Sequence, residues 1–232
     1  MADARAATVL LFDIDGTLIC SGGAGRRALV RTFETLFGVG DPLDFPLDGL
    51  TDPSIVRAVL RRCELPDDDG QIHRVFETYL GYLPAEVDVA PTYRVYPGVV
   101  ELLERATARG GQHAVGLGTG NIEQGARIKL ARGDLNRFFS FGGFGSDHED
   151  RVELIRLAHR RGAELLGRPA ECRAVVIGDT PHDVAAARAI GARAIGVGTG
   201  AFTPRRLLDC GADAAVVDLS TPEAVAAILG AG

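Results

Sequence analysis

The sequence predicts an α/β fold, namely a three-layer, Rossmann-like parallel sheet core with an inserted all-helical cap domain. Three observations support this class. Short apolar strand patterns alternate with helical patterns over most of the 232 residues. Several of these strands end abruptly in polar side chains, as strands do at the ligand-binding edge of an open parallel sheet. One long segment, residues 20–93, shows helical spacing alone.

The first expected strand ends in acids. The apolar run over residues 9–12 is followed by Asp13, Asp15 and Gly16. If the extended geometry continues, alternation of side chains places both carboxylates over one site. Two like charges this close require a cation or a shared proton, and Mg²⁺ prefers such oxygen ligands. Taken alone, this stretch also fits a loop whose acids cap a helix.

The segment after this strand is expected to be an insert. It contains three helical patterns, over residues 26–37, from 51–53 onward, and over 71–83. Thr51 followed by Pro53 is a typical helix start. We therefore expect a helical cap domain over residues 20–93, and an α/β core domain over residues 1–19 and 94–232.

From residue 94 the alternating pattern returns. Helices are expected at about residues 99–109, 122–131 and 150–166, with a further helix that follows Asp183 and ends at residue 190, and strands are expected at 113–119, 138–141, 173–178, 192–197 and 214–217. Alternating strands and helices of this kind form a parallel sheet covered on both faces. Asp13 and Asp15, Thr119, and Asp179 with Asp183 follow three of the strands, so we expect them to meet at one edge of the sheet.

The composition limits the classes of partner that the protein is expected to bind. The net charge is −6 with no basic stripe, which argues against nucleic acid. The chain has no apolar run near the length of a membrane span, and its start lacks the apolar core of a signal peptide. Its four cysteines are widely spaced and suit a reducing compartment. We expect a cytoplasmic protein without membrane contact, either a monomer or a homodimer.

The sequence resembles the haloacid dehalogenase-like hydrolases, a superfamily composed mostly of phosphatases. Residues 13–17 match its first motif, Asp-x-Asp-Gly-Thr; Gly118-Thr119-Gly120-Asn121 matches its second; and residues 178–183, with Asp179 and Asp183, match its fourth. Residues 20–93 match the helical cap that the family inserts after the first motif. The ordered set covers essentially the whole chain.

The third motif departs from the family, which usually places a Lys before the fourth motif. Arg151 occupies that region, and its guanidinium suits both phosphate oxygens and Asp183. The alternative is Lys129, the single lysine among 25 basic residues. Lys129 lies about 12 Å along its expected helix from the N-terminal end, which favours Arg151 and makes Lys129 a surface residue in the simplest interpretation.

The resemblance implies a role for each motif residue. Asp13 is the implied nucleophile and Asp15 the general acid and base. Thr119, Gly120 and Asn121 are the implied phosphate-binding group. The implied Mg²⁺ ligands are Asp13, Asp179 and Asp15 through its backbone carbonyl. Asp183 is expected to orient Arg151 or a metal-bound water, or simply to cap its helix.

The expected function is Mg²⁺-dependent hydrolysis of a small phosphorylated metabolite, such as phosphoglycolate, a sugar phosphate or a nucleotide, through an aspartyl-phosphate. Family members that cleave carbon–halogen bonds lack the second Asp of the first motif, so the resemblance, with Asp15 present, implies phosphate esters as substrates. Two alternatives stay open. One is a phosphotransferase or phosphosugar mutase, although the loop over residues 47–52 carries no basic residue for a second phosphate. The other is a catalytically silent binding module on the same fold.

Overall fold

The computed structural model describes residues 7–108, 111–168 and 172–230. Its main feature is a six-stranded, all-parallel sheet with the strand order β5-β4-β1-β6-β7-β8. The strands are β1 Thr8–Phe12, β4 His113–Gly118, β5 Gly142–Gly143, β6 Arg173–Gly178, β7 Arg193–Val197 and β8 Ala214–Val216. The expected α/β class is confirmed. The N-terminal stretch used above to argue against a signal peptide, residues 1–5, lies outside the described residues, as does the expected helix end at residue 109.

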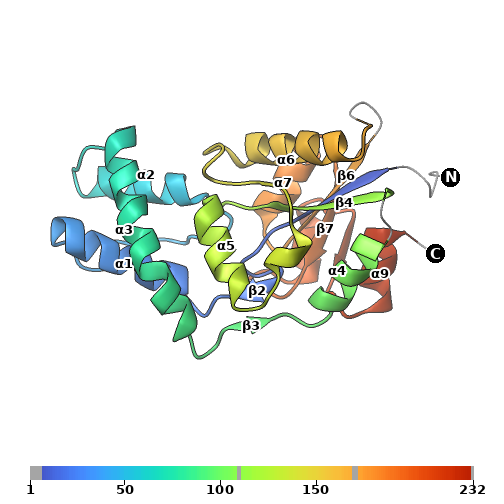
Figure 1. Cartoon of the computed structure of the whole chain (residues 1–232), viewed down its shortest axis with the longest axis horizontal. Helices are drawn as coiled ribbons and strands as arrows, with labels where there is room; N and C mark the ends of the chain where they lie inside the picture. The colour runs from blue at the N-terminus through green and yellow to red at the C-terminus, as the bar shows by residue number, and fades with distance from the viewer. Residues whose placement is uncertain (1–6, 109–110, 169–171, 231–232) are drawn as a thin grey trace.

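Helices cover both faces of this sheet (Figure 1). One face carries α4 Val99–Ala108, α5 Glu123–Ala131 and α9 Pro222–Leu229, and the other carries α6 Arg151–Leu165, α7 Pro181–Ala189 and α8 Pro204–Asp209. Strand β1 is buried on both sides because its side chains alternate: Leu10 and Phe12 pack in one apolar cluster, whereas Val9 and Leu11 pack in the other. The central strand is thereby fixed in register, and with it the residues that follow it.

Three further helices form a unit beside the sheet (Figure 1). They are α1 Ala24–Phe37, α2 Asp52–Arg62 and α3 Asp69–Asp88. Their apolar stripes meet in a third cluster, in which Phe33, Val59 and Tyr79 are fully or almost fully buried. The helix start expected at residues 51–53 is confirmed, with Thr51 as the N-cap. A short antiparallel ribbon of β2 Ile19–Cys20 and β3 Arg94–Val95 joins this unit to the sheet.

Some expected elements were wrong. The apolar residues 138–141 are not a strand: a 3₁₀ helix covers Asn136–Phe138, and the edge strand is Gly142–Gly143. Phe139 and Phe141 are both buried, but in different clusters, so their apolar character reflects packing between layers. The ribbon residues 19–20 and 94–95 were also missed.

Within the described part of the chain, no helix is both long and apolar enough to cross a bilayer. Cys20, Cys63 and Cys210 are free thiols.

Candidate active site

The carboxyl ends of three adjacent strands place the polar residues together. Asp13 follows β1, Thr119 follows β4 and Asp179 follows β6, and these strands lie side by side in the order β4-β1-β6. All three residues line a cavity of about 260 Å³ between the sheet edge and the helical unit. The convergence expected from a shared sheet edge is therefore present in the structure. The cavity is small, which suits a ligand of few atoms.

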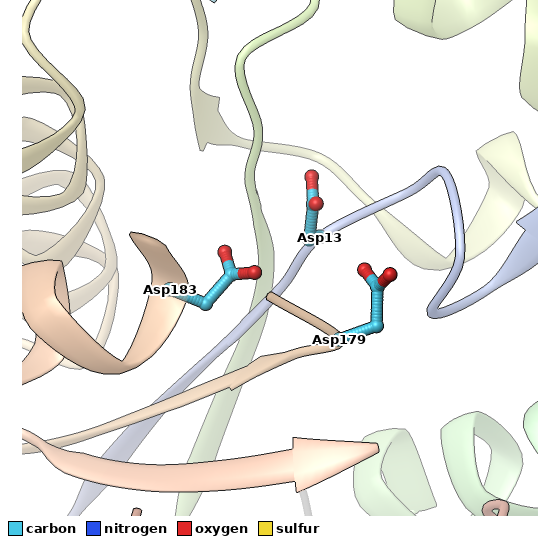
Figure 2. Close-up of side chains that lie close together, drawn as sticks. All are labelled: Asp13, Asp179 and Asp183. Atoms are coloured by element: carbon cyan, nitrogen blue, oxygen red, sulfur yellow. The ribbon is translucent and has the colours of Figure 1, made fainter. Parts of the chain in front are cut away.

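Three buried acids form the centre of the site. Asp13, Asp179 and Asp183 each offer a carboxylate oxygen, and these oxygens lie within 4.8 Å of one another (Figure 2). Glycines permit this approach: a Cβ at Gly178 would lie 2.1 Å from the Asp183 carboxyl carbon, and one at Gly200 would lie 1.8 Å from an Asp179 oxygen. The acids can therefore pack closely only because glycine occupies these two positions.

Crowding of these acids shifts their pKa values. Burial, and then the charges of Asp13 and Asp183, raise the pKa of Asp179 from 3.8 to about 9. Burial also raises the pKa of Asp13 to about 6, although the nearby Arg151 opposes the shift. A hard divalent cation among these oxygens would relieve the repulsion, so the donor set and its charge fit Mg²⁺.

Arg151 links Asp13 to Asp183. It begins α6, directly after the N-cap Asp150. Its Nη2 lies 3.0 Å from Asp13 Oδ2 and 2.6 Å from Asp183 Oδ1, and its side chain is 8% exposed. Of the two basic residues considered for the third motif, Arg151 is thus the one that contacts Asp183.

Asp183 takes part in two sets of hydrogen bonds: the expected contact with Arg151 is present, but the N-cap of the helix is Thr180 and Asp183 is the third residue after it. It forms a capping box at the start of α7, in which Thr180 donates its N–H and its hydroxyl to Asp183 Oδ2. The other oxygen, Oδ1, accepts two hydrogen bonds from Arg151. Both oxygens of Asp183 are therefore engaged, which holds the Arg151 fork beside Asp13.

Lys129 is not a surface residue, and that interpretation was wrong. Its side chain is buried, with Nζ 2.6 Å from Asp15 Oδ2 and 2.5 Å from Asn121 Oδ1. The distance of Lys129 along the helix axis gave the wrong expectation because α5 packs against α3, so that a residue on the side of the helix reaches the site. Lys129 thus contacts Asp15, whereas Arg151 contacts Asp13 and Asp183.

Asp15 lines the same cavity as Asp13, but its carboxylate belongs to a different network. Oδ1 accepts a hydrogen bond of 2.6 Å from the Ser21 hydroxyl, and Oδ2 accepts bonds from Lys129 and Asn121. Burial raises the pKa of Asp15, but the charge of Lys129 and these hydrogen bonds outweigh burial, so the pKa lies below its ordinary value. The Asp15 side chain does not belong to the group of acids formed by Asp13, Asp179 and Asp183.

The expected phosphate-binding segment forms the loop between β4 and α5. Thr119 is fully buried, and its Oγ1 accepts hydrogen bonds from the Asn121 backbone and side chain. Gly120 lies under the helical unit: its carbonyl accepts from Asp52 N–H at 2.8 Å, and a Cβ would lie 2.4 Å from the Leu50 carbonyl oxygen. No larger residue fits at Gly120.

Several cavity-lining residues were not anticipated as site residues, and three of them form hydrogen bonds there. Ser21 lies in a glycine-rich stretch whose sequence gave no sign of its contact with Asp15. The Gly49 carbonyl accepts a hydrogen bond from Arg151 at 3.2 Å. Asp52, expected only as part of a helix start, accepts the Ile122 N–H at the beginning of α5. All three depend on contacts between segments distant in sequence, which local patterns do not report.

The fold and the buried acids define an α/β enzyme with its candidate active site at the carboxyl edge of the sheet. A family model described as haloacid dehalogenase-like hydrolase matches residues 7–191, and the chain belongs to this family of hydrolases.

Relatives and solved structures agree with this assignment. The chain is 29% identical over 201 residues to the phosphoglycolate phosphatase of Synechococcus elongatus, covering 86% of this chain and 87% of that protein. It is 31% identical over 198 residues to protein SUPPRESSOR OF QUENCHING 1, chloroplastic, of Arabidopsis thaliana, covering 83% of this chain but only 18% of that longer protein. The structure of CbbY from Rhodobacter sphaeroides in complex with phosphate has the same fold, with a TM-score of 0.73 at 22% identity, covering 96% of this chain and 99% of that one.

Proposed function

We propose that the protein is a Mg²⁺-dependent phosphatase that hydrolyses a small phosphomonoester through an aspartyl-phosphate on Asp13. The observation that carries the proposal is the arrangement of Asp13: its carboxylate faces the cavity, beside Arg151 and next to Asp179 and Asp183. The similarity to a phosphoglycolate phosphatase along most of both chains supports the same reaction class.

In the first step an Asp13 oxygen attacks phosphorus, the oxygen–phosphorus bond forms, and the bond to the ester oxygen breaks. Asp15 gives a proton to the departing oxygen, which leaves as an alcohol. In the second step water attacks the aspartyl-phosphate and Asp15 takes up a proton from that water, so phosphate leaves and both acids are regenerated.

The other side chains of the site stabilise charge. Arg151 and Thr119 flank Asp13, and they would bind the phosphoryl oxygens during both steps. Asp183 acts through Arg151, whose guanidinium it orients. Asp13, Asp179 and the backbone carbonyl of Asp15 would hold Mg²⁺, which supplies positive charge to offset the carboxylates and the phosphoryl group.

The helical unit over residues 20–93 would act as the cap domain. Leu29, Leu47 and Ile55 bring apolar surface to the cavity opposite the acids. Such a wall excludes water from the phosphoryl group and contacts the rest of the substrate. With a cavity of about 260 Å³, a metabolite with a short carbon chain fits better than a nucleotide.

The test is release of inorganic phosphate from a panel of small phosphomonoesters, with Mg²⁺ and with a chelator. Asp13→Asn is expected to lose at least about 1,000-fold in rate, because an amide cannot serve as the nucleophile. Asp209→Asn is the matched control, since this exposed acid pairs with Arg205 and does not line the cavity. Chelation should abolish release by the wild type and the control alike. Metal-independent release, or near-normal release by Asp13→Asn, would overturn the proposal.

A further inference from the structure

We propose that Lys129 is a positioning residue, which holds the Asp15 carboxylate in the orientation needed for proton transfer to the leaving oxygen. The inference rests on the proposed function and adds to it a residue outside the matched motifs. Its basis is a closed triangle of three side chains, formed by Asp15, Asn121 and Lys129.

Each member of the triangle contacts the other two. Lys129 Nζ donates to Asp15 Oδ2 at 2.6 Å and to Asn121 Oδ1 at 2.5 Å, and Asn121 Nδ2 donates to Asp15 Oδ2 at 3.0 Å. Because Lys129 can only donate, it fixes which end of the Asn121 amide carries the oxygen. The amide nitrogen is then directed at Asp15 and at Thr119 Oγ1. The triangle thus joins the proton-transfer residue to the phosphate-binding loop.

The helical unit covers the ammonium group of Lys129. A Cβ at Gly25 in α1 would lie 3.2 Å from Lys129 Nζ and 3.5 Å from the Tyr79 hydroxyl oxygen. The Lys129 residue is 5% exposed, so its charge meets Asp15 with little water between. A compact ammonium fits under Gly25, whereas a planar guanidinium needs more room, which explains a lysine in a chain whose other basic residues are all arginine.

Lys129 does not duplicate Arg151. Arg151 contacts Asp13 and Asp183, whereas the hydrogen bonds of Lys129 go to Asp15 and Asn121. One cation therefore serves the attacking carboxylate and the other serves the residue that protonates the leaving group. Loss of Lys129 should harm mainly those reactions in which the leaving oxygen needs a proton.

The experiment compares kcat/KM for two esters, because this constant reports phosphoryl transfer to Asp13 whatever the rate of the later hydrolysis. The best alkyl phosphate of the panel has a leaving group that needs protonation; para-nitrophenyl phosphate has one that departs unaided. For Lys129→Met we expect a loss of about 100-fold on the alkyl ester and less than about 10-fold on the aryl ester. In an Asp15→Asn background, Lys129→Met should lower kcat/KM for the alkyl ester only slightly below the value of Asp15→Asn alone.

Arg132→Met is the matched control. Arg132 follows Lys129 at the end of the same helix and also links core to helical unit, but it bonds to the carbonyls of Val87 and Ala90 rather than to Asp15. Arg132→Met should lower kcat/KM for both esters by the same factor. A second variant, Gly25→Ala, suits a helix and displaces the ammonium by a few tenths of an ångström from the opposite side. Gly25→Ala should lower kcat/KM less than Lys129→Met does, and again more for the alkyl ester than for the aryl ester. If Lys129→Met does not fold, Gly25→Ala tests the proposal in its place.

Equal losses on both esters, or an undiminished loss in the Asp15→Asn background, would overturn the positioning role while leaving phosphatase activity in place. A wild type that releases phosphate from neither ester would instead overturn the proposed function, and the positioning role with it.

Discussion

Asp52 is a buried acid of the site whose ionisation lowers the free energy of unfolding. Its carboxylate is buried where the helical unit meets α5, with Asp15 raising its pKa and Lys129 lowering it. Burial is the larger effect, so the pKa rises from 3.8 to about 6. A carboxyl with a raised folded-state pKa contributes most stability when protonated, below about pH 4, and that contribution is lost as pH rises through about 6.

Asp52→Asn should therefore stabilise the protein at high pH. The amide stays neutral and its oxygen can still accept the Ile122 N–H, so the free energy of unfolding at about pH 8 should exceed that of the wild type by up to about 3 kcal/mol. The gain should fall to a few tenths of a kcal/mol near pH 4, where the folded-state carboxyl is protonated and the unfolded-state carboxyl is about half protonated. Urea unfolding at the two pH values measures this difference, with the exposed Asp209→Asn as a flat reference. A gain of the same size at both pH values would rule out ionisation as its cause.

At the scale of elements, the start of α2 joins the helical unit to the core. Thr51 caps α2 by accepting the Ser54 N–H, and its hydroxyl also donates to the Glu149 carbonyl at 2.9 Å, just before α6. Arg57 adds an ion pair with Glu149. One buried threonine thus caps the start of a helix and donates a hydrogen bond across the boundary.

Thr51→Ala should cost about 2 to 3 kcal/mol in the free energy of unfolding, since it removes both the cap and the bond to Glu149. Thr221→Ala is the matched control, because Thr221 caps α9 through the Ala224 N–H and no more than the cap is lost. It should cost about 1 kcal/mol. Equal costs in chemical denaturation of the two variants would mean that the bond across the boundary contributes nothing.

Elements with local signals were predictable from the sequence. Thr51 with Pro53 indicated α2, and the apolar run before Asp179 indicated β6 with its observed bounds. The edge strand β5 was misplaced because Phe139 and Phe141 form an apolar pattern, whereas the paired residues are glycines. Helices α8 and α9 were missed because each is short, although each begins with the same Thr-Pro signal.

At the scale of the whole molecule, one topological rule accounts for most of the site. Parallel strands share a carboxyl edge, so Asp13, Thr119 and Asp179 could be brought together before any coordinates were known. The rule does not extend to side chains that reach the edge from a helix flank or from the helical unit. Lys129 and Ser21 were misjudged or missed for that reason, since their contacts with Asp15 depend on how α5 and α1 pack. The single lysine of the chain was the one available signal.

The most direct test of the account is to acid-quench the enzyme during turnover of its best ester and to weigh the peptide that contains Asp13. The account predicts a mass gain of one phosphoryl group on Asp13, seen with Mg²⁺ and lost in Asp13→Asn. A peptide of unchanged mass under conditions of rapid phosphate release, or a phosphoryl group on another residue, would contradict the central claim that Asp13 is the nucleophile.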